Sequence, residues 1–180
     1  MQFGPTAYVI LGILGLGAHS GYDIKQLADN STRHFWATSY GQIYPELKRL
    51  AEAGLIKPKD ASRGTRQRTL YFLTAKGEQT LRVWVTSPEV ESLEIRDEML
   101  LKLFFADEMS NKETVRHLEA MRGRHKQVAA GLREHEPMAQ AHPQRMKHEV
   151  LRFGIAFHEW CADWFGRLAK DIETGKETKK

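Results

Sequence analysis

The sequence has very little cysteine, with Cys161 alone among 180 residues. A single cysteine excludes both an intrachain disulfide and a zinc site built from several cysteines, as expected for a protein of the reducing cytoplasm. Long apolar runs are also absent. The longest, residues 7–18, is shorter than the roughly 20 residues that a membrane-spanning helix needs. Because that run also lacks the basic start and cleavage site of a signal peptide, we predict a cytoplasmic protein with no membrane partner.

An excess of charge of one sign is nearly absent as well. The 27 Lys and Arg residues and 23 Asp and Glu residues give a formal net charge of +4, which does not by itself indicate a nucleic-acid partner. The distribution is more informative. Residues 1–86 hold 11 basic and 6 acidic residues, whereas residues 87–180 hold 16 and 17. The whole positive excess therefore lies in the first half of the chain.

Motifs of enzymes are missing too. The sequence contains no glycine-rich phosphate loop, no nucleophile elbow and no quartet of metal-ligating residues. His158 and Cys161 lie close together, and His125 and His135 share one predicted helix, but such spacings are weak indicators of a metal. We favour packed side chains for these residues, and we predict no enzyme, no cofactor and no metal site.

The first half of the chain has the element order of a winged helix-turn-helix. Pro5 suits the first turn of an apolar helix, and Ser20 with Asp23 starts a second. A third helix, a two-stranded hairpin and a fourth helix follow, and the fourth runs from the cap Thr74 to about residue 86. The sequence therefore predicts a mainly helical protein whose DNA-binding domain spans residues 1–86.

The third helix carries the clearest signals. Ser39 and Gln42 have the spacing of a capping box, and Gly54 suits the C-terminal cap. Apolar residues recur at helical spacing on one face, and the other residues of the helix are polar. The N-terminal turns of a recognition helix meet the major groove, where hydroxyl and amide groups reach phosphates and base edges.

The hairpin that follows is basic. We expect one strand to begin at residues 55–57 and the second to span residues 67–73. Five basic residues lie on or between these strands, against the single acidic residue Asp60: Lys57, Lys59, Arg63, Arg66 and Arg68. Such a hairpin suits a wing that follows the phosphate backbone or enters the minor groove.

The second half of the sequence predicts three helices. The first spans residues 93–106, the second begins at a capping box at Ser110, and the third spans residues 144–172. We assign residues 90–173 to a helical dimerisation domain and residues 174–180 to a polar tail. The last helix carries an apolar seam with a repeat near 3.5 residues, which is typical of helix pairing between chains. The predicted dimer interface consists of Leu151, Gly154, Phe157, His158, Cys161, Trp164, Phe165 and Leu168. Met146, Phe153 and Trp160 mark a second apolar direction, which requires a second neighbour.

Three segments carry a family resemblance: GQIYPELKRL at residues 41–50, EAGLI at residues 52–56 and YFLTAKG at residues 71–77. With them the chain resembles the PadR family of bacterial transcriptional regulators, in a subgroup with a long C-terminal helical domain. The resemblance implies a homodimer that represses genes through a palindromic operator in double-stranded DNA. It also implies, for some members, release from DNA by a phenolic or other small aromatic effector.

The resemblance implies two sets of DNA contacts. On the third helix they are Ser39, Tyr40, Gln42, Tyr44, Lys48 and Arg49. On the wing they are Lys59, Arg63, Thr65, Arg66 and Arg68.

Several alternatives stay open. Tyr44 and Tyr71 suit the core as well as they suit DNA contact. Trp84, Trp160 and Trp164 suit helix packing better than an effector cavity. A transcriptional activator and a winged-helix protein–protein adaptor are the other functions that the sequence permits.

Overall fold

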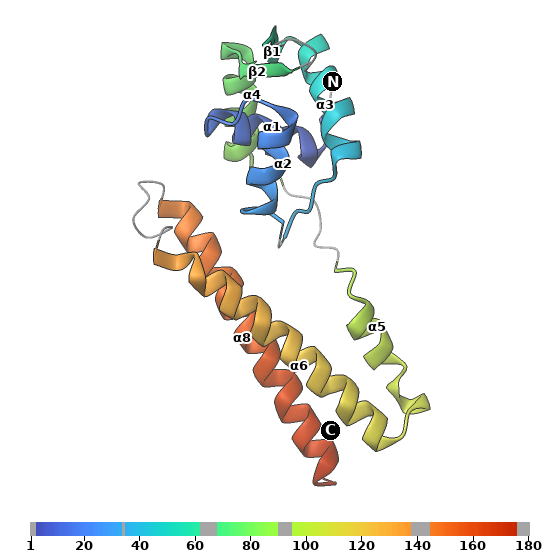
Figure 1. Cartoon of the computed structure of the whole chain (residues 1–180). Helices are drawn as coiled ribbons and strands as arrows, with labels where there is room; N and C mark the ends of the chain where they lie inside the picture. The colour runs from blue at the N-terminus through green and yellow to red at the C-terminus, as the bar shows by residue number, and fades with distance from the viewer. Residues whose placement is uncertain (1–2, 34, 62–67, 90–94, 138–144, 176–180) are drawn as a thin grey trace. The chain divides into compact units, whose positions relative to one another are not determined.

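The computed structural model describes residues 3–33, 35–61, 68–89, 95–137 and 145–175 (Figure 1). The chain divides into two compact units, Met1–Ser92 and Leu93–Lys180. Each unit has its own buried cluster of apolar side chains. The units are therefore described separately.

The described residues of the first unit form four helices and one hairpin in the predicted order. The helices are α1 (Pro5–Gly15), α2 (Gly21–Asp29), α3 (Tyr40–Glu52) and α4 (Ala75–Thr86). Strands β1 (Ile56–Asp60) and β2 (Thr69–Leu73) pair antiparallel, with Ile56 opposite Leu73. The predicted winged helix-turn-helix with a two-stranded wing is confirmed.

Local signals explain where these elements begin and end. The Ser20 hydroxyl accepts a hydrogen bond from the backbone N–H of Asp23, and the Asp23 carboxylate accepts from the N–H of Ser20. Thr74 caps α4 by accepting from the N–H of Gly77. Gly54 follows α3 with a φ of 70°, a left-handed conformation that glycine adopts without steric cost. Each of these predicted caps is confirmed.

One apolar core holds the first unit together. Helices α1, α2 and α3 and the start of β1 contribute its most buried side chains, which include Ile10, Leu11, Ile24, Ile43, Leu47, Leu50 and Ile56. On α3 the buried residues recur three and four positions apart, so one face of the helix is fixed inward and the opposite face is turned outward. That outward face is the predicted DNA-reading surface.

The second unit is a long helical hairpin with a short helix before it. Its elements are α5 (Glu98–Phe104), the 3-10 turn η1 (Ala106–Glu108), α6 (Asn111–Glu134) and α8 (Arg145–Glu173). Helices α6 and α8 lie side by side and run antiparallel (Figure 1). Their shared core consists of Leu118, Met121, Cys161, Phe165 and Ala169.

The prediction of a helix over residues 93–106 was wrong at its start. Residues 95–97 are not helical, and α5 begins at Glu98. The Asp97 carboxylate accepts from the backbone N–H groups of Met99 and Leu100, so Asp97 is the N-cap. The helix starts at this aspartate cap, although apolar residues precede it in the sequence.

Gly77 gives the clearest stability prediction. A Cβ atom at Gly77 would lie 2.1 Å from the backbone oxygen of Leu55, because α4 starts directly against the end of the α3–β1 connection. We expect Gly77→Ala to lower the free energy of unfolding by about 3 kcal/mol. Gly12→Ala is the matched control, since nothing lies within 4 Å of its Cβ position in α1, and it should stabilise by roughly 0.5–1 kcal/mol. Urea denaturation measures both, and equal midpoints would contradict the close packing.

Candidate functional site

The predicted residues of α3 lie on the face opposite the core. Tyr40, Gln42 and Lys48 are exposed, and the Tyr44 side chain is 52% exposed. The rings of Tyr40 and Tyr44 stack with their centres 6.1 Å apart. These exposed side chains carry hydroxyl, amide and ammonium groups.

Two of the predicted contacts on α3 already have partners within the chain. The Gln42 Oε1 atom accepts from the Ser39 N–H at 2.9 Å and from the Ser39 hydroxyl at 3.1 Å. Its amide NH₂ group can still donate to DNA, whereas its oxygen is committed to the capping box. Arg49 is half-buried, with its guanidinium 3.4 Å from the Glu46 carboxylate and over the Phe3 ring. Arg49 therefore faces its own domain more than the outer surface of α3.

The wing is described on both sides of its tip. Lys57 and Lys59 are exposed on β1, and Arg68 directly precedes β2. The predicted contacts Arg63, Thr65 and Arg66 lie outside the described residues. The described part of the wing thus presents three basic side chains beside α3.

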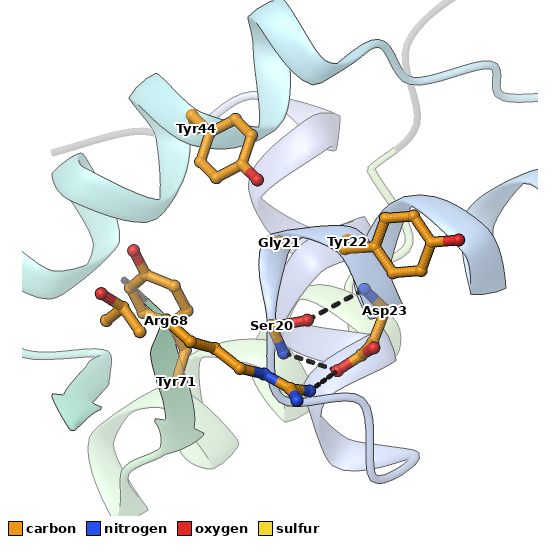
Figure 2. A pocket seen from close by; sticks show the side chains of 8 residues that line it. Ser20, Gly21, Tyr22, Asp23, Tyr44, Arg68 and Tyr71 are labelled. Carbon is orange, nitrogen blue, oxygen red and sulfur yellow. Dashed lines mark hydrogen bonds and ion pairs between the residues drawn. The ribbon is translucent and has the colours of Figure 1, made fainter. Parts of the chain in front are cut away.

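A hollow of about 610 Å³ lies between α2, α3 and the wing. Its lining comes from residues 20–23, Tyr44 of α3, and Arg68, Thr69 and Tyr71 of the wing (Figure 2). We call this hollow the tyrosine pocket. Tyr44 and Arg68 are among the DNA contacts predicted from the sequence. The sequence did not predict that Tyr22, Asp23 and Thr69 line the same pocket.

The absence of a side chain at Gly21 leaves room for Tyr44 in the wall of the tyrosine pocket. A Cβ atom there would lie 2.7 Å from Cε1 of Tyr44, so the hydroxyl end of the Tyr44 ring lies close to the first residue of α2 (Figure 2). A larger residue at position 21 would displace this ring. The sequence signal for it was Gly21 itself, which is an unfavourable residue within a helix.

Two ionisable groups of the tyrosine pocket have shifted pKa values. Hydrogen bonding by the Ser20 side chain lowers the pKa of Asp23, the Ser20 N–H that donates to the carboxylate lowers it too, and the Arg68 guanidinium, with Nη2 3.5 Å from Asp23 Oδ2, lowers it further. Burial raises the pKa of Tyr71, and the nearby Tyr44 adds to that shift. At neutral pH the pocket therefore contains the charged Asp23 carboxylate and the protonated Tyr71 phenol.

The predicted dimer seam on α8 is divided between two faces. Cys161 and Phe165 are buried against α6 of the same chain, and Gly154 lies next to the Leu132 side chain. Leu151 and Leu168 are half-buried, whereas Phe157 and Trp164 are exposed. Much of the seam is therefore covered within one chain.

The second apolar direction of α8 is the uncovered one. Six exposed apolar residues succeed one another at intervals of four and three along the helix: Met146, Val150, Phe153, Phe157, Trp160 and Trp164. We call them the α8 stripe. The regular 4-3 spacing is the pattern of a helix that packs along a second partner.

His125 and His158 connect α6 to α8. Their Nδ1 atoms lie 2.8 Å apart, and burial lowers the pKa of His125. One imidazole must then donate and the other accept, which neutral rings can do and two protonated rings cannot. Within the described ranges, no group of three or more His, Cys, Asp or Glu side chains is placed to hold a metal ion.

Comparison with known proteins agrees with this geometry. A model of the PadR-like family of transcriptional regulators matches residues 10–83, and a model of the virulence activator alpha C-terminal domain matches residues 95–173. The negative transcriptional regulator PadR of Bacillus subtilis is 36% identical over 107 residues. Residues 10–83 belong to the PadR-like family of transcriptional regulators. The matched segment covers 59% of this chain and 59% of the length of that relative.

Solved structures of the family extend the similarity to nearly the whole chain. A crystal structure of B. subtilis PadR in complex with operator DNA has a TM-score of 0.83 at 28% identity, covering 93% of this chain and 98% of that one. A structure of the same protein in complex with p-coumaric acid has a TM-score of 0.74 at 24% identity and covers 96% and 99%. At that identity the second likeness is one of fold. None of the described helices has the length and apolar character needed to span a membrane.

Proposed function

We propose that this PadR-like regulator binds a palindromic operator as a homodimer and represses the genes that the operator controls. The observation that carries the proposal is the outer face of α3. Tyr40, Gln42, Tyr44 and Lys48 are exposed there, although the core needs only the opposite face. A helix with one apolar face and one face of hydrogen-bonding groups, beside a basic wing, has the arrangement that reads a major groove.

The homodimer is proposed from the α8 stripe. Six exposed apolar side chains in one row along a helix are the kind of patch that marks a protein–protein interface. A second copy of α8 would cover the stripe with an identical one, as a two-fold interface requires. The pairing also provides the second recognition helix that a palindromic operator needs.

Repression is proposed from the B. subtilis relative, which is a negative transcriptional regulator. Activation is the second candidate, because the model that matches residues 95–173 describes virulence activators. We also propose a small phenolic or aromatic effector, since the B. subtilis protein has been crystallised with p-coumaric acid. A reporter gene behind the operator distinguishes repression from activation by the sign of the change in its expression. Adding phenolic acids to the same cells tests the effector.

Selection from a library of random duplexes tests DNA binding and symmetry together. The expected product is a motif of two inverted half-sites whose centres lie about 10 base pairs, or a multiple of that, apart. Two chains should be present in each complex. A protein that retains no duplex at low salt would overturn the proposal, and a motif without inverted symmetry would overturn its dimeric form.

A further inference from the structure

The tyrosine pocket is rich in hydrogen-bond donors that come from three separate elements. The Gln26 amide donates to the Tyr22 hydroxyl oxygen at 2.8 Å, which leaves the Tyr22 proton available to another acceptor. Among the described residues, no hydrogen-bond partner is found for the hydroxyls of Tyr44 and Tyr71. Phenol donors beside a guanidinium bind an anion with several oxygens, and phosphate is the anion that DNA offers.

Asp23 is the acidic residue of the pocket, and its contacts suggest a holding function. Its carboxylate accepts from the Ser20 N–H at 3.0 Å, whereas the Arg68 guanidinium is 3.5 Å away. The Arg68 and Asp23 side chains are 53% and 36% exposed, and an ion pair so open to water is weak. The weak pair with Asp23 therefore opposes a move of Arg68 toward a second anion only slightly, and the Ser20 N–H keeps Asp23 in position.

Tyr44 links this pocket to the reading surface. The hydroxyl end of its ring lies close to Gly21, while its helix α3 also carries Gln42 and Lys48. An anion in the pocket would therefore lie beside the recognition helix. That is the position of a backbone phosphate when the helix occupies the major groove.

We propose that the tyrosine pocket binds one phosphate of the DNA backbone, and that Arg68 exchanges Asp23 for that phosphate when DNA arrives. Tyr44 and Tyr71 donate to the same phosphate, whereas the Tyr22 hydroxyl points away from them (Figure 2). The inference rests on the proposed function, since it assumes that α3 faces DNA. Beyond the proposed function, it names the contacts that fix the register of the duplex. It also names Asp23 as an acidic side chain that competes with the DNA phosphate for Arg68.

A scan with methylphosphonates tests the pocket on a duplex that the protein itself selects from the random library. Each modified duplex carries one uncharged linkage. For the wild type we expect one linkage in each half-site at which neutralisation weakens binding roughly tenfold. Arg68→Gln should weaken binding to the unmodified duplex roughly tenfold and lower the salt slope by about one per chain. The same neutral linkage should then cost Arg68→Gln clearly less than it costs the wild type, because only the tyrosine donors still face it.

Three other variants sharpen the result. Arg82→Gln removes the same charge from an exposed position on α4 and should leave the scan unchanged. Tyr71→Phe removes only a hydroxyl and should bind the unmodified duplex severalfold more weakly than the wild type. On the duplex with the same neutral linkage, the two proteins should bind with equal affinity. Asp23→Asn keeps an oxygen that accepts from the Ser20 N–H. With Arg68 present, this variant should bind DNA severalfold more tightly than the wild type. With Arg68 replaced by Gln, the Asp23→Asn substitution should leave the affinity unchanged.

The outcomes separate the two proposals. Wild-type and Arg68→Gln scans that superpose at every linkage would overturn the phosphate site and leave the regulator proposal intact, because the duplex is still bound. Tighter binding of Asp23→Asn in both backgrounds would overturn the exchange of partners, since the gain would then be a general charge effect. A wild type that selects no duplex would overturn the regulator proposal itself.

Discussion

Trp160→Glu is expected to leave the protein monomeric and to abolish tight operator binding. Trp160 lies within the α8 stripe and is 59% exposed in the single chain. In a two-fold dimer each substitution is made twice, and losing a buried tryptophan costs about 2 kcal/mol or more per copy. The dimer dissociation constant should therefore rise at least roughly a thousandfold. Sedimentation equilibrium measures it, and the affinity for the operator should fall with it.

Two control variants separate this effect from damage to the fold. Lys170→Glu changes the charge at an exposed position of the same helix, outside the α8 stripe, and should leave the dimer intact. Phe165→Ala removes a side chain that packs against α6, so it should lower the free energy of unfolding by roughly 3–5 kcal/mol. A dimeric Trp160→Glu protein would show that another surface joins the two chains.

Gln42→Glu is expected to fold as stably as the wild type and to lose about a hundredfold in affinity for the selected duplex. A carboxylate can accept the same two hydrogen bonds from Ser39 that Gln42 accepts, and it suits the first turn of a helix. On the DNA face, however, it would stand against phosphates, where like charges cost several kcal/mol. Thermal unfolding and fluorescence anisotropy measure the two properties separately.

Gln42→Ala is expected to affect both the stability of the domain and its preference among operators. Loss of the capping box should lower the stability of the domain by about 1 kcal/mol, and loss of the amide should change the preference between related operators. Gln79→Glu is the matched control, because it makes the same charge change at an exposed position of α4 and should bind DNA normally. Unimpaired binding by Gln42→Glu would limit Gln42 to a structural role.

Much of the first unit was predictable because its signals are local. Ser20, Ser39 and Thr74 begin their helices through bonds to residues three positions further on, and a capping pattern of that length is visible in the sequence. Gly54 ends α3 for a reason equally local. The start of α5 was mistaken because the apolar residues before Asp97 extend the helical pattern, whereas the cap decides the boundary.

The division of the α8 seam could not be predicted. A repeat near 3.5 residues arises whenever two helices pack lengthwise, whether the partner belongs to the same chain or to another. The sequence showed two apolar directions on this helix, but it did not show which one α6 covers. Packing of α6 against Cys161 and Phe165 decided that, and it left the α8 stripe uncovered.

The sequence by itself determined the order of the elements, the polar face of α3 and the uneven charge of the two halves. Each of these depends on neighbours within a few residues or on composition. Only the tertiary structure brought Arg68 to Asp23, 45 positions away, and Tyr44 onto Gly21. Contacts of this kind depend on how α2, α3 and the wing pack on a shared core, and no periodicity in the chain records them. That is why the basic residues of the first half of the chain predicted a surface for phosphate, whereas the tyrosine pocket is a product of the fold.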